Sequence, residues 1–108
     1  MPWLNGGQVR VEIRPVFDET VMASERPVRI AAAKTLKLLQ SLNDATELFS
    51  HTGLRFEELH GFIEPTTGEQ LYSLRITQSV RAIACLLSGP TIVLVSLHTD
   101  HDKAYKKR

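Results

Sequence analysis

Three side chains in the last third of the chain could act on a phosphate group. Arg75 and Arg81 flank a short polar stretch, and His98 follows an apolar one. A guanidinium offers a fixed fork of donors that fits phosphate oxygens, and histidine changes charge near neutral pH, which suits acid or base work. A charge beside so apolar a run as residues 81–87 is unusual. The ordinary alternatives are an Arg that pairs or snorkels at a strand edge and a His that is merely exposed.

A group of His and Asp residues near the C-terminal end raises the question of a metal site. His98, Asp100, His101 and Asp102 are closely spaced, and such residues can ligate zinc. The sequence has neither the flanking Cys pairs nor the HExxH frame that would strengthen this interpretation. Asp residues between a strand and a helix also have an ordinary capping role. We therefore predict no metal and no cofactor.

Length and composition predict one small domain over residues 1–108. With 43% hydrophobic residues the chain can bury a single modest core. The single Cys85 excludes an intrachain disulfide framework, and no stretch approaches the roughly 18 apolar residues that a membrane span needs. We expect a soluble cytoplasmic protein with no membrane partner. The net charge of +1 argues against binding nucleic acid by bulk charge, so any RNA contact must be local.

Residue spacing predicts an early strand and a helical middle. Residues 9–17 alternate apolar and charged side chains, as a half-buried strand does, with Pro15 fraying its end. Residues 27–42 place apolar side chains at helical spacing and begin with a proline, which suits the first helical turn. Asp44 and Glu47 have the spacing of a capping box and predict a short second helix.

The C-terminal half predicts three strands, at residues 71–77, 81–87 and 91–97. The expected fold is α+β, with a small, mainly antiparallel four-stranded sheet and one long and one short helix packed on it. Because strands buried on both faces are continuously apolar, the following residues should be buried: Leu36, Leu39, Ile83, Leu86, Val93 and Val95.

The C-terminal half resembles the RelE/ParE superfamily, especially its YoeB and HigB branches. The similar segments read RFEELHG, LYSLRITQSVRAIACLL and TIVLVSLH. In that family a turn leads to a strand that ends in Arg-Ile, an Arg opens the next strand, and the last strand ends in His. The order of the elements in the first half agrees with the family without sharing a motif.

The resemblance implies the toxin of a type II toxin–antitoxin system. Such a toxin is a ribosome-dependent endoribonuclease (mRNA interferase), and its partners are a cognate antitoxin, the ribosome and mRNA. Attack of a ribose 2′-hydroxyl on the adjacent phosphate needs a base, a cation and an acid. Side chains alone can supply all three, without a metal.

The resemblance also assigns roles to individual residues. Arg81 would stabilise the phosphorane, Arg75 would hold a neighbouring phosphate, and His98 would act as acid or base. Glu57 matches a Glu of the YoeB branch and is a candidate base, although a Glu beside Glu58 is also typical of a solvated face. His60 takes the place of a basic turn residue that contacts RNA.

The sequence departs from this pattern beside the terminal histidine. Where the YoeB and HigB branches carry a Tyr, this chain has Leu97 and Thr99 around His98. Tyr105 is the nearest aromatic hydroxyl and is a catalytic candidate that could stack on a base or assist proton transfer. Its alternative role is an apolar anchor for the tail. The tail also offers candidate RNA-binding residues, or a solvated end: His101, Lys103, Lys106 and Lys107.

Strand alternation sets a geometric condition on the site. Arg81 shares a face with Arg75 only if the turn at residues 78–80 is odd or bulged, and His98 joins them only if the turn at residues 87–90 is effectively even. Two other functions stay open at this point. One is a gyrase poison like the ParE branch, and the other is an interaction module of the same fold that has lost activity.

Overall fold

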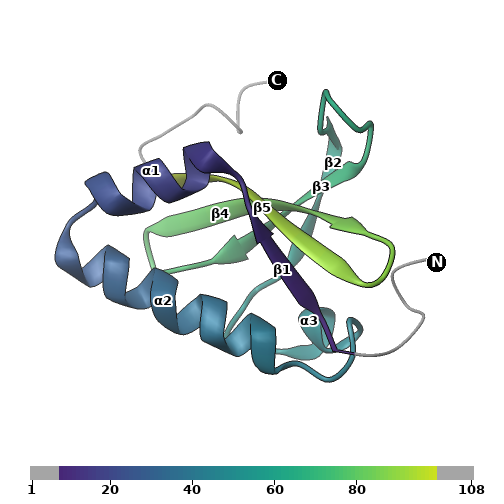
Figure 1. Cartoon of the computed structure of the whole chain (residues 1–108), viewed down its shortest axis with the longest axis horizontal. Coiled ribbons are helices and arrows are strands. Elements are labelled where there is room, and N and C mark those ends of the chain that lie inside the picture. Colours follow the sequence, from purple (N-terminus) through teal and green to yellow (C-terminus); the bar gives the residue numbers. More distant parts are fainter. Residues whose placement is uncertain (1–7, 100–108) are drawn as a thin grey trace.

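The computed structural model describes residues 8–99, which form one five-stranded sheet and three helices (Figure 1). The strand order is β1-β5-β4-β3-β2. β1 runs parallel to β5, and the other neighbouring strands are antiparallel. The strands are β1 (Arg10–Ile13), β2 (Glu57–Ile63), β3 (Gln70–Arg75), β4 (Val80–Leu87) and β5 (Thr91–Thr99).

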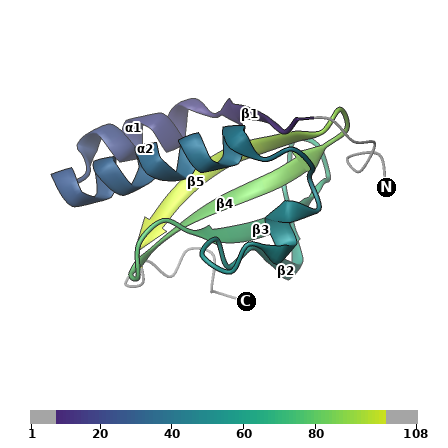
Figure 2. The same cartoon turned by 90° about the horizontal axis from the view of Figure 1, so that it is seen from below.

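Two helices cover one face of this sheet. α1 (Pro15–Ala23) and α2 (Arg26–Ser41) lie side by side above it, and the short α3 (Glu47–Ser50) lies near β3 and β2 (Figure 2). No helix of the described part of the chain is long and apolar enough to cross a membrane. The other face of the sheet carries no helix within residues 8–99 (Figure 2).

The predicted long helix and the three C-terminal strands are confirmed. α2 starts and ends one residue before the predicted range, with Pro27 in its first turn. The capping-box spacing also gives the expected short helix: the Glu47 carboxylate accepts hydrogen bonds from the backbone N–H groups of Asn43 and Asp44, and Asp44 accepts one from the N–H of Thr46.

The expected count of four strands and two helices is wrong in two places. The first strand ends at Ile13, because Pro15 begins α1 instead of fraying a strand; proline fits the first helical turn, where no N–H donor is needed. Phe17 is therefore a buried helix residue. β2 was not predicted, since its two consecutive glutamates and Gly61 obscure the alternation.

The main core lies between the helices and the sheet. Phe17, Leu39 and Leu48 pack with every second residue of the central strands, including Leu74, Ala82, Ala84, Ile92 and Leu94. Four of the six residues predicted to be buried are so: Leu39, Ile83, Leu86 and Val93. Leu36 and Val95 are only half-buried, because Leu36 lies at the flank of the buried face of α2 and Val95 is an extra residue in a β-bulge.

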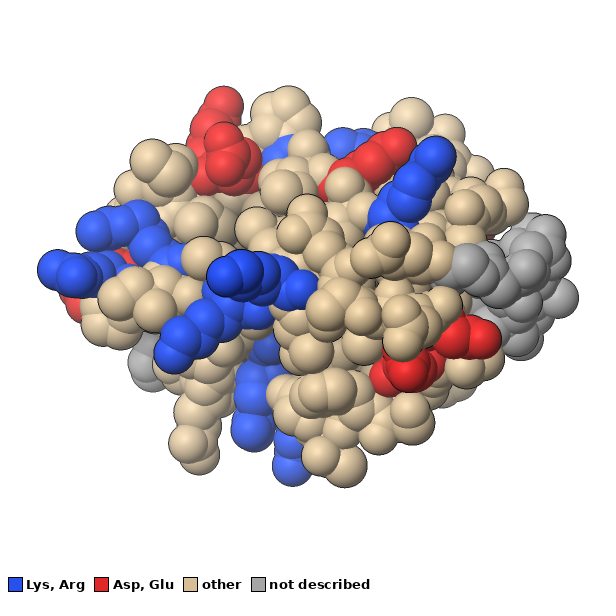
Figure 3. Space-filling model, turned by 60° about the horizontal axis from the view of Figure 1, so that its bottom comes forward, with Lys and Arg blue, Asp and Glu red and all other residues tan. Residues whose placement is uncertain are grey.

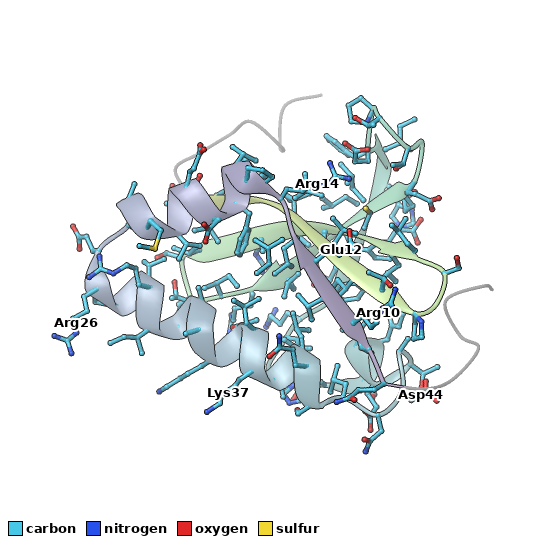
Figure 4. All side chains as sticks on the ribbon, viewed as in Figure 1. Arg10, Glu12, Arg14, Arg26, Lys37 and Asp44 are labelled. Carbon is cyan, nitrogen blue, oxygen red and sulfur yellow. The ribbon has the colours of Figure 1, made fainter. Side chains whose placement is uncertain are left out.

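The sheet curves so that its two edges approach each other. Arg14 directly follows the edge strand β1, Glu64 directly follows the edge strand β2, and their side chains form an ion pair of 3.9 Å. In Figure 4, Arg14 extends toward the end of the β2–β3 hairpin. Cys85 lies on the face away from the helices, yet it is fully buried. The middle of this second face is therefore buried, although no helix of residues 8–99 covers it.

Candidate active site

Arg75, Arg81 and His98 form one row across three adjacent strands. Arg75 of β3 lies directly opposite Arg81 of β4, and Arg81 lies directly opposite His98 of β5. Directly opposite residues project to the same face of a sheet, so all three side chains share the face away from the helices. The three residues therefore meet the condition that strand alternation sets for a common site, which is that they share one face of the sheet.

The two turns meet that condition in different ways. Residues 76–80 separate Arg75 from Arg81, an odd number, which preserves the face. The next turn, residues 88–90, is also odd and would by itself place Leu97 opposite Arg81. Val95 is unpaired between the pairs Leu94–Ala84 and Ser96–Ile83, and this β-bulge shifts the register by one residue. The bulge therefore brings His98 into the row.

A second row lies beside the first on the same face. Glu57 is opposite Ser73, Ser73 is opposite Ile83, and Ile83 is opposite Ser96. Each of Ser73, Ile83 and Ser96 is two positions from a member of the first row, so the alternation of strand side chains puts both rows on one face. Glu57 is exposed at the end of this row. A carboxylate, two guanidinium groups and an imidazole thus share one surface.

The guanidinium groups have buried donors that nothing in the described part of the chain satisfies. Arg75 Nε and Arg81 Nη1 are buried without a hydrogen-bond partner among residues 8–99, and neither Arg forms an ion pair within that range. Buried donors without partners are costly. Two like charges directly across a sheet also repel. An anion placed between these groups would relieve both effects.

Ser96 orients the histidine of the site. Its Oγ lies 2.7 Å from Nε2 of His98, which is hydrogen-bonding distance. Ser96 and Ser73 were not singled out from the sequence. The signal for Ser96 was its position two residues before His98 in a strand, which predicts a shared face.

His60 does not join these rows. Its imidazole lies 3.6 Å from the carboxylate of Glu58 and is largely exposed. Glu58 is opposite Tyr72, whose ring stacks on Phe56 at 4.9 Å and approaches Phe49. Glu58 alternates with Glu57 along β2, so His60 and Glu58 belong to the opposite side of the strand.

The tail candidates lie outside the described residues. This holds for Tyr105 and for the proposed RNA-binding residues His101, Lys103, Lys106 and Lys107. It also holds for Asp100, His101 and Asp102 of the possible metal cluster. Within residues 8–99, no group of three or more His, Cys, Asp or Glu side chains is arranged to hold a metal ion.

The sequence matches no protein-family model and no curated protein. A comparison with solved structures finds the archaeal RelE–RelB complex from Pyrococcus horikoshii OT3, with a TM-score of 0.63. The match covers 86% of this chain and 96% of that chain. The fold is RelE-like. The two sequences share 16% identity, so the likeness concerns the arrangement of helices and strands. It confirms the RelE-like architecture predicted from the C-terminal half.

Proposed function

We propose that this RelE-like domain is the toxin of a toxin–antitoxin pair and cleaves mRNA on the ribosome. The observation that carries the proposal is the row of Arg75, Arg81 and His98, with Glu57 beside it on the same face. These residue types are the ones that a metal-free attack on an RNA phosphate requires. They come from four different strands, so the fold is what brings them together.

Each side chain has a defined part in the proposed reaction. The Glu57 carboxylate accepts the proton of the ribose 2′-hydroxyl, and the 2′-oxygen attacks the adjacent phosphorus. Arg81 stabilises the added negative charge of the phosphorane with its unpaired donor. His98, oriented by Ser96, gives a proton to the leaving 5′-oxygen. The products are a 2′,3′-cyclic phosphate end and a 5′-hydroxyl end.

Arg75 holds a phosphate next to the scissile one in this proposal. It lies directly opposite Arg81, and phosphates that follow one another along an RNA strand could each meet one guanidinium. Tyr105 and the basic tail residues are further candidates for base stacking and phosphate contact.

The proposed partners are a co-encoded antitoxin, mRNA and the ribosome, in the cytoplasm. A solved structure with this fold is a complex of RelE with RelB, which supports an antitoxin partner. An antitoxin segment that folds on binding can cover a large surface. If that segment is acidic, its carboxylates would pair with the guanidinium groups of Arg75 and Arg81 and so exclude RNA from them.

The proposal is tested by replacing Arg81→Ala and measuring cleavage on programmed ribosomes. Loss of phosphorane stabilisation should lower the rate about 100- to 1,000-fold, or about 2.7–4 kcal/mol, as for removal of an oxyanion-hole donor. The matched control is Arg10→Ala, an exposed Arg that lies opposite Thr91, at the other end of β5. Its rate should stay at the wild-type level.

The same samples separate the alternative functions. Cleavage by Arg81→Ala at the wild-type rate would show that Arg81 is not the phosphate-stabilising group. Inhibition of gyrase supercoiling by a wild-type chain that cleaves no RNA would indicate a ParE-like poison. Neither activity, together with tight antitoxin binding, would indicate an interaction module.

A further inference from the structure

The outward face of α2 carries four cations and no acidic residue. Arg26, Arg29, Lys34 and Lys37 are all exposed, and the helix contains no Asp or Glu. At 3.6 residues per turn the four positions fall within about 140° of the helix circumference. The buried residues of the helix, Ala32, Thr35 and Leu39, lie on the opposite side. We call the four cations the α2 basic stripe.

The figures show this surface directly. Arg26 and Lys37 point away from the sheet (Figure 4). Figure 3, which brings the lower side of Figure 1 forward, shows most blue side chains over the left and centre of the surface; red ones lie mainly toward its upper edge and right, where a few blue ones also occur. The charge is local, since the whole chain has a net charge of only +1.

Apart from a hydrogen bond that Arg29 Nη1 donates to the Ser24 carbonyl just before α2, the stripe does not stabilise its own helix. Arg26 and Arg29 lie in or next to the first turn, where the positive end of the helix dipole disfavours cations, and no acid occupies that turn. Each cation also has a like charge three positions away, an arrangement that repels. None of the four forms an ion pair within residues 8–99. A bound anion would offset these unfavourable terms.

We propose that the α2 basic stripe binds the phosphate backbone of double-helical RNA. The inference rests on the proposed function, for which it supplies a contact with ribosomal RNA away from the cleavage site. α2 contains no aromatic residue and no Asn or His, so it lacks the aromatic platforms on which single-stranded RNA-binding proteins stack unpaired bases. Its four cations are spread along about 16 Å of the helix axis. This arrangement suits the regularly spaced phosphates of an RNA duplex.

An acidic protein segment fits this surface less well. Peptides that dock along a helix use apolar anchors at helical spacing. The only large apolar side chain of α2 that is exposed is Ile30, at 44%. A single partly exposed anchor between four cations favours a partner that is recognised by charge alone.

The test measures binding of a labelled mixed-sequence RNA duplex over a range of salt concentrations. The stripe variant is Lys34→Gln/Lys37→Gln, which keeps good helix formers in place. The control is Arg10→Glu, which lowers the net charge by the same amount on β1. The stripe variant should bind roughly tenfold more weakly at moderate salt, with a salt slope shallower by about 2. The control should retain wild-type binding.

Two results would overturn the inference. One is equal weakening in the stripe variant and the control, which would indicate nonspecific attraction. The other is competition by polyglutamate as effective as that of RNA at equal charge, which would assign the stripe to an acidic protein partner.

Arg81→Ala separates this inference from the proposed function, since it should lower the cleavage rate about 100- to 1,000-fold and leave duplex binding unchanged. Duplex binding that depends on the stripe, in a wild-type chain that never cleaves mRNA, would refute the proposed function and leave the stripe as an RNA site.

Discussion

At the scale of single residues, the candidate site is built at the expense of stability. Arg75 and Arg81 are directly opposite each other, and each has a buried nitrogen without a partner in the described part of the chain. Apolar side chains would fit this face of the central strands better, as the buried Ile83 and Cys85 on the same face of β4 show. The arrangement makes sense if the missing partner is an anion that arrives with the substrate.

Replacing Arg81→Met should therefore stabilise the fold while removing activity. Methionine keeps much of the aliphatic length of arginine, and it removes both the unsatisfied donor and the repulsion with Arg75. The free energy of unfolding should rise by about 1 kcal/mol. Urea unfolding followed by circular dichroism measures the change, with the exposed Arg10→Met as the control. A loss of stability in Arg81→Met would mean that Arg81 has a structural partner outside residues 8–99.

At the scale of elements, the sequence predicted correctly those helices and strands whose apolar residues recur with a regular period. α2 and strands β3 to β5 have long runs of consistent periodicity and were predicted to within a few residues. α1 and β2 were missed, because Pro15 is compatible with both a strand end and a helix start, and because the glutamates of β2 are typical of a solvated loop. Tertiary pairing with β3 makes β2 a strand.

The site was predictable only in part for the same reason. Arg75, Arg81 and His98 could be chosen by type and position, but whether they share a face depends on the bulge at Val95. Nothing in the alternation of residues 91–97 marks Val95 as the unpaired residue. The bulge is a property of how β5 fits β4, and sequence alone gave only the condition that it must satisfy.

The ion pair between the two sheet edges should make the β2–β3 hairpin sensitive to acid. The backbone N–H of Thr67 donates to the Glu64 carboxylate at 2.8 Å and Arg14 adds an opposite charge, and these hold the pKa of Glu64 below its ordinary 4.5. A carboxyl with a lowered folded-state pKa stabilises the fold above the ordinary value. That contribution is lost as the pH falls through 4.5 and then through the lowered pKa.

Glu64→Gln should consequently be less stable than wild type at neutral pH, with a difference that shrinks as the pH falls below 4.5. Denaturant midpoints measured across this range give the difference, and Glu69→Gln in the same hairpin is the control. A difference that stays constant down to low pH would show that the Glu64 charge contributes nothing and that only its shape matters.

At the scale of the whole molecule, the first and last described strands are neighbours. β1 pairs along its length with β5, as in Arg10 with Thr91 and Ile13 with Leu94, and β5 also pairs with β4. Within residues 8–99, the three helices and the other strands lie between β1 and β5 in the chain. The edge of the sheet at β1 and β5 therefore depends on contacts between residues that are distant in sequence, which form slowly because a long loop must close first.

This topology governs when the domain can act during its own synthesis. A nascent chain that has not yet exposed β5 beyond the exit tunnel has an unpaired β1, an incomplete sheet and no His98 opposite Arg81. Chains arrested before Thr91 has emerged should remain sensitive to protease, whereas chains extended by a linker so that Thr99 has cleared the tunnel should become resistant. Protection that arises earlier would contradict this order of events. A domain proposed to cleave mRNA on ribosomes would thus assemble its site only after β5 has left the exit tunnel of the ribosome that makes it.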